Sequence, residues 1–378
     1  MPTATARTHR RPPAAAPRPA HYLLLIATVV VLNVVGIVMV LSASSVLSIT
    51  TYGSAWYFFE RQLIWTVLGA VAFYVALRID YRRWRDWTQP LLFASTAMLV
   101  LVLVPHFGIY VAGSRRWLGV GSWRFQPTEL AKLALVLFAA DLLTRREHDM
   151  HDWRATLRPV LVAVVVLGGL IFLEPDLDSA VLLGVIAGAI LLVAGARVRH
   201  LASVSALGMG AFLVLALSAS YRRARLLTFL HPSAAAANGG YQLVQSLIAL
   251  GSGGVSGVGL GAGRAKWLFL PNAHTDFIFA VIGEELGLIG TLAVLGLFAA
   301  FAVLGVRAAR RAPDRFGMLL ATGITVWVVA QAVVNIGGVV GLLPVSGVPL
   351  PFVSFGGSAL VFTMLATGIL TNVARQGR

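Results

Sequence analysis

The chain has 378 residues, of which 58% are hydrophobic and only 12% are charged. A water-soluble domain carries about 25% charged residues, so this composition excludes a set of soluble domains and indicates a protein whose solvent is largely lipid. The sequence contains no cysteine, which excludes disulfide scaffolds, thiol redox chemistry and thiolate metal sites. A net charge of +15 suggests a nucleic-acid partner, but the positions of the charges argue against one.

Apolar runs of about 20 residues have the length that a helix needs to cross a bilayer. They predict an all-α polytopic membrane protein with about ten transmembrane helices. The runs are 22–43, 61–78, 89–105, 126–143, 159–173, 179–195, 201–219, 277–304, 316–341 and 358–373.

Arginine is concentrated in every second connection between these runs. If the N-terminus is cytoplasmic, most of the 30 Lys and Arg residues fall on the inside. This bias predicts that both termini are cytoplasmic, and it assigns the positive charge to membrane topology and anionic lipid rather than to nucleic acid. We expect a disordered basic tail over 1–20, one transmembrane domain over 21–373 and a short cytoplasmic tail over 374–378.

Two outside connections differ from simple linkers. The segment 220–276, between the seventh and eighth runs, is a long extracytoplasmic loop. Within it, 241–250 has the spacing of a short helix at the membrane surface, and glycine-rich 251–263 predicts a backbone that approaches a ligand or another segment closely. Between the ninth and tenth runs, 341–358 is apolar but too rich in Pro and Gly for a helix. Such backbone is tolerated at membrane depth only where protein buries it or it lines a cavity, which predicts a re-entrant segment beside a site.

Asp276 is the last polar residue before the long apolar run that follows the loop, so we expect it at the outer membrane boundary. Partial desolvation of a carboxylate there favours its protonated form and suits it to accept a proton. The alternative is a structural role, in which Thr275 or Asp276 caps the helix that starts at Phe277. Glu284 and Glu285 follow one turn or more deeper in the same run.

Ionisable residues at other unexpected positions are also candidates, because charges within membrane spans are costly. Glu129 and Lys132 are three residues apart on one face of the fourth helix and can pair. The pair either receives a charged substrate group or joins packed helices. The outer turn with Glu174, Asp176 and Asp178 either binds a divalent cation through carboxylate oxygens or caps the next helix.

Motifs spread over residues 22–373 closely resemble the SEDS family (shape, elongation, division and sporulation), the membrane-embedded peptidoglycan glycosyltransferases. Within this family, residues 272–285 are more similar to the division type, FtsW, than to the elongation type, RodA. Ser346 stands where many division members carry lysine, so no role of that lysine is carried over. The motifs are Phe58-Phe59-Glu60-Arg61-Gln62, Arg78-Ile79-Asp80-Tyr81-Arg82, Arg115-Arg116-Trp117-Leu118, 125–132, Glu174-Pro175-Asp176-Leu177, 241–246, His274-Thr275-Asp276-Phe277, Gly283-Glu284-Glu285-Leu286-Gly287 and Pro349-Leu350-Pro351-Phe352.

The resemblance implies polymerisation of lipid II outside the cytoplasmic membrane of a bacterium, in septal wall synthesis during division. The 4-hydroxyl of an acceptor disaccharide attacks C1 of the lipid-linked donor chain with inversion, and polyprenyl pyrophosphate leaves. The essential acid of the family falls on Asp276, which we expect to act as general base. We expect Arg61, Arg116 and Lys132 to meet the pyrophosphate charge, with Mg²⁺ or Mn²⁺ as an additional cation and no organic cofactor.

Further substrate contacts are expected from charged and hydrogen-bonding residues near the outer side, namely Glu129, Asp176, Gln245, Ser246, Glu285 and Ser358. The expected partners are lipid II, lipid-linked glycan, membrane lipid, other divisome proteins and a class B penicillin-binding protein whose transpeptidase crosslinks the glycan. The alternatives are a lipid II flippase, an elongation-type polymerase and a non-catalytic divisome scaffold. Most interior charge lies toward the outer side, whereas a flippase needs a polar path to both faces.

Overall fold

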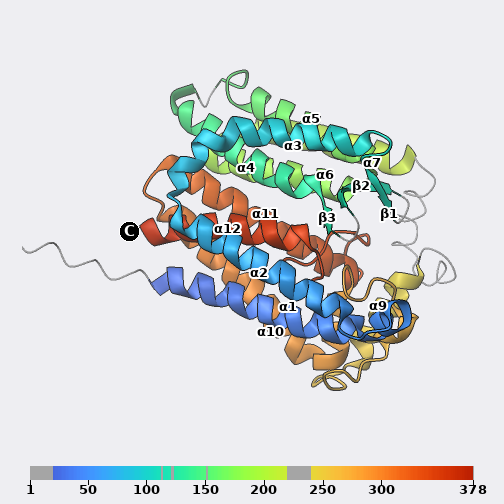
Figure 1. Cartoon of the computed structure of the whole chain (residues 1–378). Coiled ribbons are helices and arrows are strands. Elements are labelled where there is room, and N and C mark those ends of the chain that lie inside the picture. The colour runs from blue at the N-terminus through green and yellow to red at the C-terminus, as the bar shows by residue number, and fades with distance from the viewer. Residues whose placement is uncertain (1–19, 112–113, 121–122, 150–151, 219–239, 378) are drawn as a thin grey trace, which may run out of the picture.

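The helices of the protein run side by side, and its irregular parts gather at one end of them (Figure 1). A computed structural model describes residues 20–111, 114–120, 123–149, 152–218 and 240–377. The small sheet and α9 lie at the end opposite the C-terminus (Figure 1). Residues 1–19, most of the expected disordered tail, and 219–239, the first part of the expected long loop, lie outside the described residues.

The described chain contains helices and three short strands. The helices are α1 (Ala20–Tyr52), α2 (Tyr57–Arg78), η1 (Tyr81–Trp87), α3 (Thr88–Leu103), α4 (Pro127–Arg145), η2 (Glu147–Asp149), α5 (Leu157–Leu173), α6 (Leu177–Ala194), α7 (Val198–Ser218), α9 (Tyr241–Ser252), η3 (Ala265–Phe269), α10 (Ile278–Arg310), α11 (Arg315–Val339) and α12 (Ser358–Gln376). Each apolar run expected to span the membrane coincides with one long helix of this set.

Seven helical stretches of the described residues are long and apolar enough to cross a membrane. They are α1, α2, η1 with α3, α6, α10, α11 and α12. Helix α4 carries Glu129, Lys132 and Asp141 in its interior, and α5 has only 17 residues. A helical, multi-pass membrane fold is therefore confirmed, while the crossings by α4, α5 and α7 stay a prediction.

Helix α4 is the centre of the packing, and it is buried along almost its whole length. It contacts α3, α6, α11 and α12, while α12 packs on α2 and α10 packs on both α1 and α11. Small side chains permit these close approaches. At Gly323 of α11, for example, a Cβ would lie 2.8 Å from Val136 of α4 and 2.7 Å from Ile190 of α6.

The strands form a small antiparallel sheet that the sequence analysis did not predict. It consists of β1 (Ile109–Val111), β2 (Ser114–Val120) and β3 (Trp123–Phe125) in that order. The sheet packs against α3 and the start of α4. Gly119 is required in it, because φ is +153° and a Cβ would lie 1.9 Å from the Trp123 carbonyl oxygen.

Helix α10 is interrupted near its start, and the glycine-rich loop fills the interruption. Gly287 has a non-helical backbone with φ of +66°. The amide of Leu288 donates to the Gly254 carbonyl at 3.0 Å, and the amide of Val258 donates to the Glu284 carbonyl at 3.0 Å. The expected close approach of 251–263 is thus confirmed, and what it approaches is another segment of the chain.

The helix expected at 241–250 is α9. Leu243, Ser246 and Ala249 form its buried face, which packs against α10 and α11. The helix is confirmed, whereas its position at the membrane surface stays a prediction.

At the start of α11, Asp314 joins this helix to η1. It caps α11 by accepting from the Gly317 amide at 2.8 Å, and it also accepts from the Tyr81 hydroxyl at 2.8 Å and from Arg82 Nε at 2.7 Å. Partial burial acts in the opposite direction, but these three hydrogen bonds and the Arg82 charge together lower the pKa of Asp314. A carboxyl with a lowered pKa in the folded state stabilises the fold above its unfolded pKa.

We expect the variant Asp314→Asn to reduce stability at neutral pH and to lose this effect in acid. Asn keeps the helix cap but removes the charge. The difference in Tm from the wild type is therefore largest above pH ~4 and vanishes as the pH falls through the lowered pKa of Asp314. Thermal unfolding in detergent over this pH range measures it, with the exposed Asp149→Asn as control. A difference that is independent of pH contradicts the assignment.

Candidate active site

Asp276 lies in the turn between η3 and α10, and its side chain is half-buried. The Asn272 carbonyl accepts hydrogen bonds from the amides of Thr275 and Phe277, at 3.1 and 3.2 Å. Asn272 itself has φ of +57°, a conformation that asparagine tolerates better than most residues. Helix α10 begins at Ile278 with Phe277 in the N-cap position. Asp276 therefore lies one residue before the N-cap position of α10, and both its catalytic and its structural role stay predictions.

Asn335 of α11 fixes the backbone that carries Asp276. Its Nδ2 donates to the Asp276 carbonyl oxygen and to the Val348 carbonyl oxygen, both at 2.9 Å. Asn335 is only 2% exposed, and a buried donor that loses its acceptor carries a free-energy cost. The amide therefore holds the Asp276 turn at a set position relative to the irregular segment 341–357.

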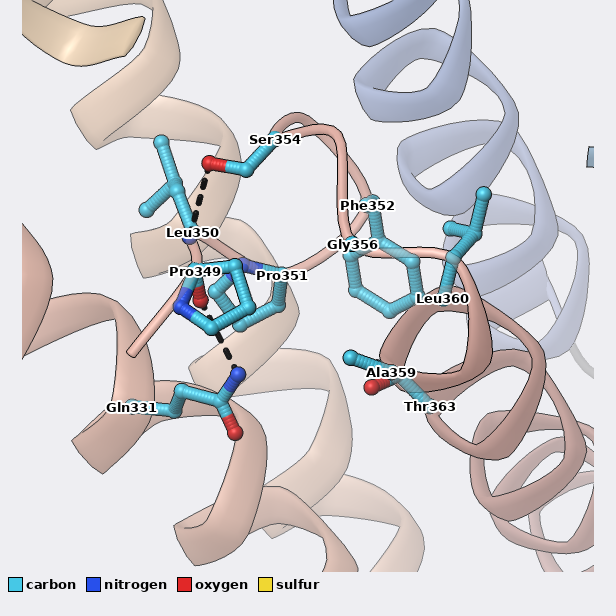
Figure 2. Close-up of a pocket in the computed structure, with 10 residues that line it drawn as sticks. All are labelled: Gln331, Pro349, Leu350, Pro351, Phe352, Ser354, Gly356, Ala359, Leu360 and Thr363. Carbon is cyan, nitrogen blue, oxygen red and sulfur yellow. Dashed lines mark hydrogen bonds between the residues drawn. The ribbon is translucent and has the colours of Figure 1, made fainter. Parts of the chain in front are cut away.

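The irregular segment 341–357 also forms hydrogen bonds with the turn that carries Asp276. The Ser354 hydroxyl donates to the Thr275 carbonyl at 2.6 Å and accepts from the Leu350 amide at 2.9 Å; Figure 2 shows the second of these bonds. The Phe355 amide donates to the His274 carbonyl at 3.0 Å. The two residues before Asp276 are thus held by a side chain and by backbone of the irregular segment.

The segment 341–357 is itself packed against the rest of the protein. Leu350, Phe352 and Val353 are buried. A Cβ at Gly36 of α1 would lie 2.5 Å from the Phe352 carbonyl oxygen, so α1 and the segment touch through their backbones. The irregular, apolar character expected for this stretch is confirmed, and its position as a re-entrant segment in the membrane stays a prediction.

His274 is two residues from Asp276 and is only 7% exposed. Its ring lies 4.6 Å from the ring of Phe58 and 5.8 Å from that of Phe355. Burial lowers the pKa of His274 to about 4. The imidazole is therefore neutral near pH 7 and places no positive charge beside Asp276.

A buried polar chain runs from α4 to the irregular segment. Lys132 Nζ donates to Glu129 Oε1 at 2.8 Å and to Gln331 Oε1 at 2.9 Å. Trp327 Nε1 donates to the same Gln331 oxygen at 3.0 Å, and Gln331 Nε2 donates to the Pro349 carbonyl at 2.9 Å (Figure 2). The pairing expected from the spacing of residues 129 and 132 is confirmed. It is connected to the segment that holds the Asp276 turn.

The structure bears differently on the two alternatives for the Glu129–Lys132 pair, a link between helices and a substrate contact. The Lys132 side chain is fully buried, which fits a link between packed helices. Glu129 Oε2 and Thr128 Oγ1 are buried without a hydrogen-bond partner among the described residues. A substrate contact of this pair stays a prediction.

Arg116 of β2 joins the small sheet to the turn between α5 and α6. Its guanidinium donates to the carbonyl oxygens of Glu174, at 3.0 Å, and of Pro175, and lies 4.0 Å from the Asp176 carboxylate. Asp176 accepts from the amide and hydroxyl of Ser179, at 3.3 and 2.9 Å. Asp176 therefore caps α6, as one of the two interpretations of this turn predicted.

Gln126 connects this turn to the start of α12. Its Nε2 donates to Asp176 Oδ2 at 3.3 Å, and its amide donates to Ser358 Oγ at 3.1 Å. Ser358 is buried. Three predicted substrate contacts, Arg116, Asp176 and Ser358, are thus brought into one polar group, and Gln126 is the link between them.

The acidic turn contains a carboxyl group that is uncharged near neutral pH. Burial, with a smaller contribution from Asp176, raises the pKa of Glu174 to about 9. Asp178 accepts from the Gly347 amide at 3.2 Å. Among the described residues, no group of three or more His, Asp or Glu side chains is arranged to hold a metal ion. The expected Mg²⁺ or Mn²⁺ ion stays a prediction.

Arg61 lies on the first turns of α2 and lines a pocket of about 270 Å³. Its guanidinium is stacked on the Tyr57 ring, 4.1 Å from the centroid. Phe58, the residue after Tyr57, packs against His274. The pocket is therefore next to the turn that carries Asp276.

The predicted contacts on α9 face protein or remain half-buried. The Ser246 hydroxyl donates to the Val339 carbonyl at 2.8 Å and so joins α9 to α11. Gln245 is half-buried on the same helix. A substrate role of either side chain stays a prediction.

Glu285 anchors the glycine-rich loop. Its carboxylate accepts from the Ser42 hydroxyl at 2.7 Å, from the Gly261 amide at 3.0 Å and from Lys266 Nζ at 3.1 Å. These partners come from α1, the loop and η3. The contacts give Glu285 a structural role, and the predicted substrate contact stays untested.

Sequence reasoning missed Gln126, Gln331 and Asn335, which connect the site. All are neutral amides, and the search for ionisable residues within spans passed over them. One feature of the sequence could have identified two of them. Gln331 and Asn335 are polar amides one helical turn apart in an apolar run. Buried polar side chains are expensive in that setting, and their common face points to a shared partner.

Comparisons with known proteins identify the family of the chain. The family model described as cell cycle protein, which groups FtsW, RodA and SpoVE, matches residues 22–378. The chain belongs to the SEDS family. The probable peptidoglycan glycosyltransferase FtsW of Geobacter metallireducens is 41% identical to this SEDS chain over 354 residues, covering 94% of each protein. Stage V sporulation protein E of Bacillus subtilis is 39% identical over 94% of this chain and 97% of its own length.

The fold is also similar to a solved SEDS-type structure. A chain from a peptidoglycan synthase complex that coordinates polymerization and crosslinking matches with a TM-score of 0.76 and 28% identity. The match covers 96% of this chain and 99% of the other. The family and the helical membrane fold expected from the sequence are thereby confirmed.

We expect Lys132→Met to destabilise the protein strongly, because it leaves Glu129 as an unpaired buried acid. Loss of one partner of a buried ion pair costs about 3–5 kcal/mol of unfolding free energy. The double variant Lys132→Met/Glu129→Gln removes both charges, and we expect it to recover much of that loss. Unfolding in detergent measures both.

Arg145→Met is the matched control, because this exposed Arg pairs with Asp141 on the same helix. An exposed pair contributes about 0–1 kcal/mol, and Asp141 keeps Arg85 at 3.2 Å. Equal stability of Lys132→Met and Arg145→Met contradicts the structural importance of the buried pair.

Proposed function

We propose that this chain polymerises lipid II by transferring the growing lipid-linked glycan to the 4-hydroxyl of lipid II, with release of polyprenyl pyrophosphate. Its relatives and its family make it a peptidoglycan glycosyltransferase. The observation that carries the finer proposal is the position of Asp276. This half-buried carboxylate stands on a turn that Asn335 and Ser354 hold in place.

In the reaction, Asp276 takes the proton of the acceptor 4-hydroxyl as that oxygen attacks C1 of the donor. The bond from O4 to C1 forms while the bond from C1 to the pyrophosphate oxygen breaks, and the electron pair leaves with the pyrophosphate. A cation beside a carboxylate lowers its basicity. Because burial keeps His274 neutral near pH 7, this neighbouring ring adds no positive charge beside the proposed base.

The leaving pyrophosphate needs cationic partners as its charge develops. Lys132 already donates to Glu129 and Gln331, and Arg116 donates to two carbonyl oxygens of the α5–α6 turn. The Arg61 guanidinium lies over the Tyr57 ring, 4.1 Å from its centroid, and forms no ion pair with a carboxylate of the described residues. Arg61 is therefore the best suited of the three predicted cations to bind phosphate oxygens in the bidentate manner of arginine.

We place this activity at the division septum, with both termini in the cytoplasm and a class B penicillin-binding protein as partner. The FtsW relative, at 41% identity, supports the division type over an elongation-type polymerase. The similarity to a synthase complex that combines polymerization with crosslinking supports the partner. A flippase would move lipid II without lengthening glycan, so formation of polymer from lipid II in detergent separates the two functions.

We expect Asp276→Asn to abolish glycan polymer in the purified complex of this chain with its transpeptidase partner. Loss of a general base lowers a rate by about 10²–10⁴-fold, while the folded structure is retained because Asn has the same shape. Gel analysis of glycan strands formed from lipid II, with and without the partner, measures this. Asp314→Asn, at the other end of the molecule, should keep full polymer formation. Full activity of Asp276→Asn removes this mechanism.

We expect Asn335→Ala to lower polymer formation by about 10- to 100-fold, because a catalytic group displaced by 1 Å loses about that much rate. The control is Asn33→Ala, which removes another buried amide, bonded to the Val29 carbonyl of its own helix at 2.8 Å. Turnover at saturating lipid II and the unfolding temperature are compared for the two variants. Equal turnover in both shows that Asn335 does not position Asp276.

A further inference from the structure

A pocket lies at the start of α2. Of the residues that line it, the proposed reaction uses only Arg61. The pocket holds about 270 Å³ and is lined by Tyr57, Glu60, Arg61, Ile64, Trp65 and Trp123. Pockets for drug-sized molecules measure about 300–1,000 Å³. A space of this size is large enough to hold a six-membered ring with its substituents.

The chemistry of the lining combines aromatic rings with groups of both charges. Trp65 of α2 and Trp123 of β3 meet edge to face, with ring centroids 5.2 Å apart. The Tyr57 ring carries the Arg61 guanidinium on its face, and Glu60 supplies a carboxylate on the rim. Aromatic faces pack against the C–H faces of a sugar ring, a carboxylate accepts from its hydroxyl groups, and a guanidinium binds an attached phosphate.

The two tryptophans are not simply part of the aromatic belt that faces lipid head groups. Trp65 is half-buried and lies against the end of the irregular segment. A Cβ at Gly357 would be 3.4 Å from the Trp65 ring. Trp65 is thus enclosed by the irregular segment on one side and β3 on the other, and with Trp123 it forms a wall of the pocket.

The pocket adjoins both parts of the candidate site. Tyr57 is followed by Phe58, which packs on His274 of the Asp276 turn. On the other side, Gly357 is followed by Ser358, which accepts from Gln126. The pocket is therefore connected through side-chain contacts to the Asp276 turn and, through residues 357 and 358, to the polar group around Asp176.

We propose that this pocket is a saccharide subsite, in which Trp123 and Trp65 hold one sugar ring of a lipid-linked substrate and Arg61 holds the phosphate next to it. The inference rests on the proposed function and deepens it, because it names residues that select the sugar. The ring belongs either to the growing donor chain or to the incoming lipid II. Donor binding governs how long the strands become, whereas acceptor binding governs the KM for lipid II.

Trp123→Ala is the decisive variant, because Trp123 is 54% exposed and its loss removes little buried packing. Trp56→Ala is the matched control, since Trp56 is 53% exposed just before α2 and does not line the pocket. We expect Trp123→Ala to raise the KM for lipid II or to shorten the strands by about 3- to 10-fold, with kcat little changed. Trp123→Phe should restore most of the loss. Trp123→Ala behaving like Trp56→Ala in both measurements overturns the subsite.

A binding measurement separates this inference from the proposed function. Fluorescent lipid II is titrated into the full complex carrying Asp276→Asn, with and without Trp123→Ala. We expect about 3- to 10-fold weaker binding when Trp123 is removed, whatever the fate of the polymerase activity. Equal lipid II binding in the two proteins, together with strands of unchanged length from the active Trp123→Ala complex, overturns the subsite even if Asp276 proves essential. Polymer formation by the Asp276→Asn complex overturns the mechanism but leaves this measurement valid.

Discussion

Asn335 makes the hydrogen bonds on which the site depends, because it joins two stretches of backbone that have no helix around them. Within a membrane protein, each backbone polar group must find a partner inside the molecule. The Asp276 carbonyl and the Val348 carbonyl find theirs in the same buried side chain. Gln331, one helical turn away, likewise donates to the Pro349 carbonyl. Two amides of α11 thus allow irregular backbone to exist beside Asp276, which itself lies in a turn rather than within a helix.

The same constraint explains the construction of α10. A helix that continued unbroken from Asp276 inward would leave the glycine-rich loop without partners. The break at Gly287 frees carbonyl and amide groups of α10, and residues 254–259 of the loop pair with them. Glu284 and Glu285 complete the arrangement by accepting from the loop and from Lys266. The loop and the start of α10 therefore form one unit, and the Asp276 turn lies between this unit and the irregular segment.

Much of the fold and part of the candidate site could be predicted from the sequence. The features that could not be predicted were missed for physical reasons. The apolar runs located the long helices, because a bilayer imposes a length and a composition. The Glu129–Lys132 pair followed from helical spacing, and Asp276 was singled out by its place at the end of a polar loop. The sheet at 109–125 was missed, since strands of three to seven residues with exposed positions leave no regular alternation. The tertiary partners of Gln126, Gln331 and Asn335 come from distant segments, and spacing along one helix carries no information about them.

The buried ion pair on α4 has an electrical consequence. A lone charge that moves across the bilayer gains or loses about 2.3 kcal/mol per 100 mV. Glu129 and Lys132 contact each other at 2.8 Å on a single helix, so their opposite charges sum to zero at nearly the same depth. Where α4 crosses the bilayer as predicted, the transmembrane voltage therefore exerts almost no net force on this pair.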